Sequence, residues 1–397
     1  MANLRSRVRL LTLLVMGGFG VMGGGLLAPA LPTLIGPFGV SAGAVGLVLS
    51  VYTLAAALTL PFTGLLLDLI GRRPVALGCL VIDGSFGLLC MWAPNFSTLL
   101  LFRFFQGIGI AGLIPVAMTI VSDWYTGEER LRVMGYLSGT IAVTAVVVLF
   151  LGGLLAELDW RFPFAVYGLS LLLAVAFFLN IPESGSSTPF AEVRASTGAY
   201  IRSLRDTLKL AEVREVFLHA LVLHYLLYAL VTFLPLFLAT EHGVRVGVAG
   251  LALAFHGLVA ALVSARAVGV KKLLGQRGTL LMGYLFIGVA LGTVVMWQQL
   301  PAVAVSLAFF GAGMGITQPA VFHWVSGAGP PELTGAVVAL FNTVKFVGMT
   351  LAPPTLRWVF DYAGVSWTFY VAAGIALLWA LRAATYPYSS TKSSAGL

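Results

Sequence analysis

Long apolar runs dominate the sequence and constrain its fold more than any other feature. A helix needs about 20 apolar residues to cross the hydrocarbon core of a bilayer. The 397-residue chain contains twelve such runs. Only 10% of its residues are charged, whereas a soluble domain carries roughly 25%. We therefore predict an all-α membrane protein with twelve transmembrane helices, at about 9–32, 41–67, 74–93, 96–121, 131–157, 162–180, 214–240, 246–267, 278–297, 300–325, 333–358 and 365–385.

A single long polar segment, residues 182–211, separates the first six runs from the last six. This spacing predicts two pseudo-symmetric six-helix bundles, at 1–181 and 212–397, joined by a cytoplasmic central loop at 182–211. Part of the loop, near Tyr200 to Leu210, is predicted to form a short amphipathic helix at the membrane surface.

The distribution of Lys and Arg predicts the orientation of the chain. Loops on the cytoplasmic side of a membrane are enriched in basic residues. With the N-terminus inside, 18 of the 23 basic residues fall on the cytoplasmic side, three fall outside, and Arg103 and Lys345 fall within spans. Both termini are thus predicted to be cytoplasmic, in a multi-pass protein of a bacterial-type inner (plasma) membrane. The same bias accounts for the net charge of +8 without a nucleic-acid partner.

The loop between the second and third runs carries a specific motif, with Gly64, Asp68, Gly71, Arg72 and Arg73. Its order of a glycine, an acid four residues later and Gly-Arg-Arg resembles the cytoplasmic signature of the major facilitator superfamily. The resemblance implies a charge latch that closes the inner gate. In this latch Gly64 would allow a close helix approach, and Asp68 would face a helix N-terminus. Asp123 and Arg130, at the next inner loop, are expected to join it.

A second motif lies in the fourth run, where Arg103 is followed by Gln106 and Gly107. It resembles a motif of the same family in which the arginine is associated with proton coupling. A buried cation is costly and needs a partner or a role. Two roles stay open for Arg103: proton coupling, or a structural bond to carbonyl groups of the first run.

The resemblance covers the whole chain in run count and orientation, and it points to the twelve-helix drug–proton antiporter branch. One departure concerns the fifth run. There Thr144, Val148 and Leu149 stand where that branch has Gly, Gly and Pro. This erosion leaves uptake or exchange of a small organic anion as an alternative to export.

Two further ionisable residues are predicted at membrane depth, and such residues are functional candidates. Lys345 lies near the middle of the eleventh run, with Asn342 on the same helix face. Lys345 could neutralise an anionic substrate or pair with an acid elsewhere. Asp83, in the third run, is the acid predicted at mid-membrane. It could act in coupling or be satisfied locally beside Gly84 and Ser85.

Polar and aromatic residues in other runs complete the set of substrate or coupling candidates. Histidine titrates near neutral pH and is a natural proton carrier. His224 shares a helix face with Tyr228 and Thr232, while His256 lies in the eighth run. The two histidines could instead be satisfied by packing. Gln318 and Tyr52 could add hydrogen bonds to a substrate.

These patterns predict a secondary transporter that works by alternating access. Proton-coupled export of a small amphipathic compound is the leading interpretation. The sequence lacks a recognisable metal-ligand spacing, phosphate loop or catalytic triad. We therefore predict that the chain is not an enzyme and needs neither cofactor nor metal. Its expected partners are a small-molecule substrate, protons and the lipid bilayer, and the expected assembly is a monomer.

Overall fold

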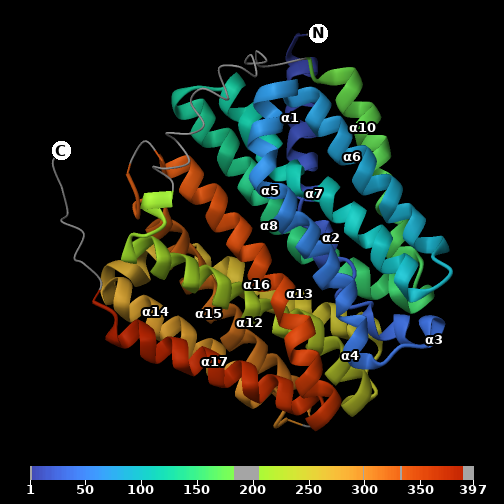
Figure 1. Ribbon diagram of the computed structural model, residues 1–397, viewed down its shortest axis with the longest axis vertical. Coiled ribbons are helices and arrows are strands. Elements are labelled where there is room, and N and C mark those ends of the chain that lie inside the picture. The colour runs from blue at the N-terminus through green and yellow to red at the C-terminus, as the bar shows by residue number, and fades with distance from the viewer. Residues whose placement is uncertain (1, 183–204, 298, 331–332, 388–397) are drawn as a thin grey trace. The chain divides into compact units, whose positions relative to one another are not determined.

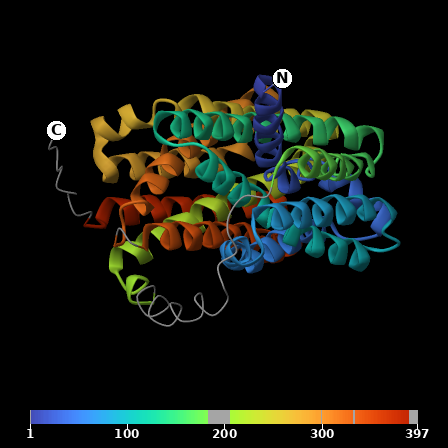
Figure 2. The same cartoon turned by 90° about the horizontal axis from the view of Figure 1, so that it is seen from above.

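The computed structural model describes residues 2–182, 205–297, 299–330 and 333–387, apart from the side chains of residues 2–6, 68 and 335. All regular elements in these ranges are helices (Figures 1 and 2). Eleven of the described helices are long and apolar enough to cross a membrane. The predicted all-α membrane fold is confirmed. Most of the surface helix predicted near Tyr200 lies outside the described residues.

Most helices match the predicted runs, with boundary shifts at several ends. The long helices are α5 (Leu47–Ile70), α6 (Arg72–Leu89), α7 (Phe96–Trp124), α8 (Gly127–Leu158), α10 (Gly168–Asn180), α12 (Ala211–His242), α13 (Val246–Ser264), α14 (Ala267–Val294), α15 (Leu300–Val325), α16 (Thr334–Ala363) and α17 (Val365–Thr385). Short helices α4 (Ala42–Val45) and α9 (Phe162–Ala165) precede α5 and α10.

The first run differs from the continuous span that was predicted. Helix α1 (Ala2–Phe19) ends in a turn, α2 (Met22–Gly25) follows, and the 3-10 helix η1 (Leu31–Leu34) comes next. Glycine weakens a helix, and this stretch contains Gly20, Gly23 and Gly24. A side chain at Gly23 would overlap the Tyr52 hydroxyl group. The break therefore brings backbone of the first run close to α5.

Residues 267–277, which were predicted as an inner loop, belong to helix α14 instead. Helix α14 thus begins before the predicted apolar run, and its first turns carry polar residues such as Lys271, Lys272 and Arg277. Gly275, with φ of +67°, interrupts it. Only glycine adopts such a conformation readily.

The chain forms two compact units, one of residues 1–254 with 325–368 and the other of 255–324 with 369–397. In the first unit, α7 packs between α5 and α6. Cβ atoms at Gly107 and Gly109 would overlap backbone of α5 and α6, respectively. In the second unit, α14 packs closely on α15 at Gly283 and on α17 at Gly288. The bundle boundaries predicted at 1–181 and 212–397 remain a prediction.

Candidate transport site

Arg103, on α7, is fully buried, with 0% exposure. Its guanidinium group donates to the Gly23 carbonyl at 2.8 Å, the Val48 carbonyl at 3.3 Å and the Gln106 side-chain oxygen. It also lies 4.1 Å from the centre of the Tyr52 ring. Arg103 thus joins α7 to α5 and to the interrupted first run. The predicted bond to a carbonyl of the first run is present.

Asp83, on α6, is 1% exposed and belongs to the same network. Its carboxylate accepts a hydrogen bond from Ser170 Oγ at 2.6 Å and another from Gln106 Nε2 at 3.1 Å. Its partners are thus not the neighbouring Gly84 and Ser85, because the α10 side chain of Ser170 reaches it instead. Gln106 bridges Asp83 and Arg103, so the acid and the base are linked without a direct ion pair.

The residues after α9 and at the start of α10 also contribute to this network, which was not predicted from the sequence. Tyr167, between these helices, donates towards the Gly23 carbonyl at 3.2 Å and the Met22 carbonyl at 3.3 Å. A Cβ at Gly87 would overlap the Tyr167 side chain. Tyr167 and Ser170 lie among apolar residues in the sequence. The one signal for them is that each places a hydroxyl group within a predicted membrane span.

Lys345 lies in the middle of α16 and is half-buried. Its ammonium group donates to Asn342 Oδ1 at 3.3 Å. Asn342 in turn donates to the Val338 carbonyl at 3.0 Å, which holds its amide in place. The predicted pairing of these two residues on one helix face is therefore present. The pairing of Lys345 with an acid, left open by the sequence, is not observed among the described residues.

His224 and Tyr228 are both buried on α12. His224 Nδ1 lies 2.9 Å from the Ala220 carbonyl. The Tyr228 hydroxyl fills the space that a side chain at Gly24 would need. Tyr228 thus packs against the interrupted first run, whereas the His224 ring bonds within its own helix.

His256 and Gln318 belong to the second compact unit. The His256 ring is 5% exposed and meets Phe310 edge-on, with 5.7 Å between ring centres. Gln318 is exposed on α15. His256 therefore has the packing environment that was one of its two predicted alternatives.

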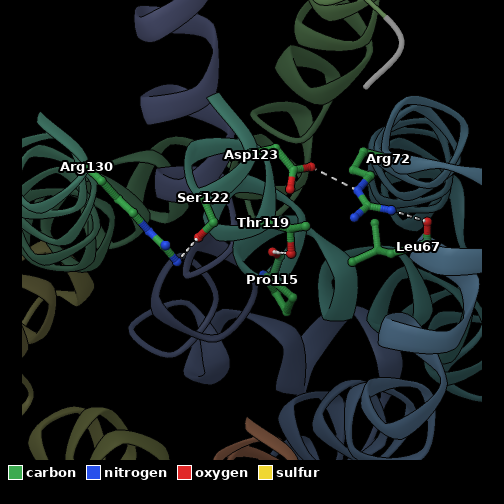
Figure 3. A network of polar contacts seen from close by, with 7 residues as sticks. All are labelled: Leu67, Arg72, Pro115, Thr119, Ser122, Asp123 and Arg130. Atoms are coloured by element: carbon green, nitrogen blue, oxygen red, sulfur yellow. Dashed lines mark hydrogen bonds and ion pairs between the residues drawn. The ribbon is translucent and has the colours of Figure 1, made fainter. Parts of the chain in front are cut away.

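Several of the residues predicted to act in gating form a polar network at the predicted inner end of the first unit (Figure 3). Arg72 forms an ion pair with Asp123 of α7 at 3.0 Å and donates to the Leu67 carbonyl. Arg130 donates to Ser122 Oγ at 2.7 Å. Arg73 bonds the Phe178 carbonyl on α10 and lies over the Phe178 ring. Gly71, with φ of +88°, makes the turn between α5 and α6.

Two members of the predicted latch, Asp68 and Gly64, lie on α5. The Asp68 side chain lies outside the described residues, so its predicted position opposite a helix N-terminus remains a prediction. At Gly64, a Cβ would meet no described heavy atom within 4 Å. The close helix approach predicted there is absent from this conformation.

Close approaches occur instead at the predicted outer end of α8. Cβ atoms at Gly152 and Gly153 of α8 would overlap the Leu26 carbonyl and backbone of α13, respectively. Beside this crossing, Glu157 accepts from Arg245 at 2.9 Å and from the Gly247 amide at 3.0 Å. The sequence analysis did not single out this clamp. Its signal was that Arg245 is one of only three basic residues predicted outside.

Comparison with known proteins agrees with this architecture. A profile described as "Major Facilitator Superfamily" matches residues 13–353 and 272–396. The chain belongs to this superfamily. Its members are transporters and not enzymes, as the sequence predicted. It is therefore a multi-pass membrane protein and a transporter of small molecules.

Individual members are similar over nearly the whole chain. The bacillibactin exporter of Bacillus subtilis is 26% identical over 388 residues, covering 94% of each chain. A class G tetracycline resistance protein of Vibrio anguillarum is 29% identical over 353 residues, covering 84% of this chain and 87% of that protein. Among solved structures, a bacterial homologue of the human lysosomal transporter Spinster, described as inward-facing and occupied, aligns with a TM-score of 0.79. It is 20% identical and covers 96% of each chain.

Proposed function

We propose that the protein is a proton-coupled secondary transporter that exports a small amphipathic compound across the plasma membrane, with both termini in the cytoplasm. Alternating access would expose one central site to each side in turn. The observation that carries the coupling proposal is the buried chain of hydrogen bonds from Asp83 through Gln106 to Arg103.

The chemistry of this network suits a proton carrier. A buried carboxylate without a direct cationic partner is costly, and taking up a proton removes that cost. Protonation of Asp83 would weaken the hydrogen bond that its carboxylate accepts from the Gln106 amide. Gln106 also accepts a hydrogen bond from Arg103. The change would therefore alter the hydrogen bond that Arg103 donates to the Gly23 carbonyl. Proton binding would thereby act on the interrupted first run.

The names of two relatives support export as the direction. One is a bacillibactin exporter and the other a tetracycline resistance protein. Uptake or exchange of a small organic anion is the second candidate. It is favoured by Lys345, which has an amide as its hydrogen-bond partner and no ion pair among the described residues.

Dye efflux from energised cells tests the proposal. Cells that express the protein are loaded with a panel of lipophilic fluorescent dyes and followed with and without a protonophore. We expect efflux that the protonophore abolishes and that Asp83→Asn reduces. Asp206→Asn serves as a control, because Asp206 is an exposed acid that pairs with Lys209 outside the network.

Efflux that persists in the protonophore would contradict proton coupling. Absence of efflux for every dye at a normal membrane level would contradict the proposed export of amphipathic compounds. It would favour the second candidate, which uptake of a radiolabelled organic acid measures directly.

A further inference from the structure

Lys345 is a cation within a membrane-spanning helix, and no acidic residue in the described part of the chain balances its charge. Its ammonium has one hydrogen-bond partner, Asn342 Oδ1, at 3.3 Å, and no carboxylate of the described residues lies within ion-pair distance. A lone charge within a membrane is costly and marks a functional position. What balances the charge therefore has to be sought outside the described side chains.

The neighbouring helix does not provide a counter-charge. Helices α12 and α16 cross closely where a Cβ at Gly348 would overlap the Leu221 carbonyl. Lys345 lies about one turn before this crossing on α16, and His224 lies about one turn after it on α12. His224 is a base and contributes no negative charge. Its Nδ1 is 2.9 Å from the Ala220 carbonyl, so that nitrogen is assigned as the donor.

The other buried charges of this unit already have protein partners. Asp83 and Arg103 are linked through Gln106. Glu215 and His219 of α12 lie 3.6 Å apart, and both are buried. The His219 side chain is 0% exposed. These groups are therefore committed within the protein.

The surroundings of Lys345 suit an amphipathic anion. Phe346, the next residue, is half-buried and packs against the apolar core of the first unit. The compact ammonium of lysine acts as a point charge, in contrast to the two-pronged guanidinium of arginine. A single carboxylate matches one point charge, and an apolar body matches the apolar character of the membrane-length segment Ala336–Ala363 that carries Lys345.

We propose that Lys345, positioned by Asn342, is the subsite that binds the anionic group of the transported compound, and that this compound is an amphipathic monocarboxylate. The inference rests on the proposed function, because it names the chemical class carried by the same transporter. Asn342 is a positioning residue: it holds the ammonium group through its Oδ1 while its amide is tied to the helix backbone.

Binding of a matched pair of probes tests the subsite. Radiolabelled naphthylacetate and naphthylacetamide share one apolar body and differ in charge. Their binding to the purified full-length protein is compared for wild type, Lys345→Gln, Lys345→Met and Lys345→Arg. Lys271→Gln is the matched control, since Lys271 bonds His323 in the second unit and lies outside the subsite.

We expect the wild type and Lys271→Gln to bind the acid at least about tenfold more tightly than the amide. Lys345→Gln and Lys345→Met should bind the two probes equally, and Lys345→Arg should keep part of the preference. A wild type that does not bind naphthylacetate or does not prefer it overturns the proposal. So does a preference that survives in a monodisperse Lys345→Gln or Lys345→Met protein.

The binding measurement separates this proposal from the proposed function. A charge preference that depends on Lys345 supports the subsite even if dye efflux from cells proves insensitive to a protonophore. Conversely, protonophore-sensitive efflux together with charge-independent binding overturns the subsite and leaves proton-coupled export standing.

Discussion

Two cations within membrane-spanning helices of the same compact unit have opposite environments. Arg103, on α7, bonds two backbone carbonyls and Gln106 and lies over the Tyr52 ring. Lys345, on α16, has a single hydrogen bond of 3.3 Å to Asn342. The exposed fraction of Arg103 is 0%, whereas Lys345 is only half-buried.

The contrast suggests a division of labour. A cation whose donors are used by the protein fixes the positions of the helices it joins. Buried charges of this kind tolerate loss of a partner poorly. A cation with unused donors can donate them to a bound substrate. We therefore interpret the Arg103 region as the coupling element and the Lys345 region as the site that recognises the substrate.

The largest expected effect is on stability and follows from Arg103→Met. This substitution leaves the Gly23 and Val48 carbonyls without their donor and the buried Asp83 without a linked cation. Breaking such a buried arrangement costs about 3–5 kcal/mol. We expect a strongly lowered melting temperature in detergent. Adding Asp83→Asn should restore part of the loss, because it removes the uncompensated charge. A wild-type melting temperature for Arg103→Met would contradict the role assigned to Arg103.

Lys345→Met should have the opposite profile. Replacing an uncompensated buried charge with an apolar side chain is often neutral or stabilising. The melting temperature should therefore stay unchanged or rise. Transport of naphthylacetate should fall by at least about tenfold, which corresponds to roughly 1.4 kcal/mol of lost interaction. A destabilised Lys345→Met protein would indicate that Lys345 has a structural role like that of Arg103.

Asp83→Asn should affect coupling with little effect on folding. Asparagine keeps a carbonyl oxygen for Gln106 and an amide for Ser170, but it cannot carry a proton. We expect accumulation driven by a pH gradient to fall by about tenfold or more while substrate binding is retained. Equal accumulation by the variant and the wild type would show that Asp83 is not the residue that carries the coupled proton.

The smallest effect is expected for Asn342→Ala. This change removes the oxygen that positions the Lys345 ammonium but leaves the charge. Loss of one such hydrogen bond is worth about 1 kcal/mol, so naphthylacetate binding should weaken by roughly fivefold. Binding of naphthylacetamide should not change. If both probes weaken equally, Asn342 acts on packing and does not position the charge.

The sequence predicted the fold well because its main determinant is the length of apolar runs. It placed the long helices and singled out Arg103, Asp83 and Lys345 at membrane depth. It could not predict which side chains meet, because contacts such as Ser170 to Asp83 join residues 87 positions apart. It also missed the break after α1, where several glycines and the packing of Tyr52 combine to end an apolar helix. The open space at Gly64 is a property of one conformation, which a sequence alone does not specify.

The division between coupling and recognition is tested most directly in proteoliposomes that contain wild type, Asp83→Asn or Lys345→Met. Accumulation of naphthylacetate driven by a pH gradient is compared with its exchange at equilibrium, which requires no net proton movement. The account predicts that Asp83→Asn loses accumulation and keeps exchange, whereas Lys345→Met loses both. Gradient-driven accumulation by Asp83→Asn, or exchange at the wild-type rate by Lys345→Met, would contradict it.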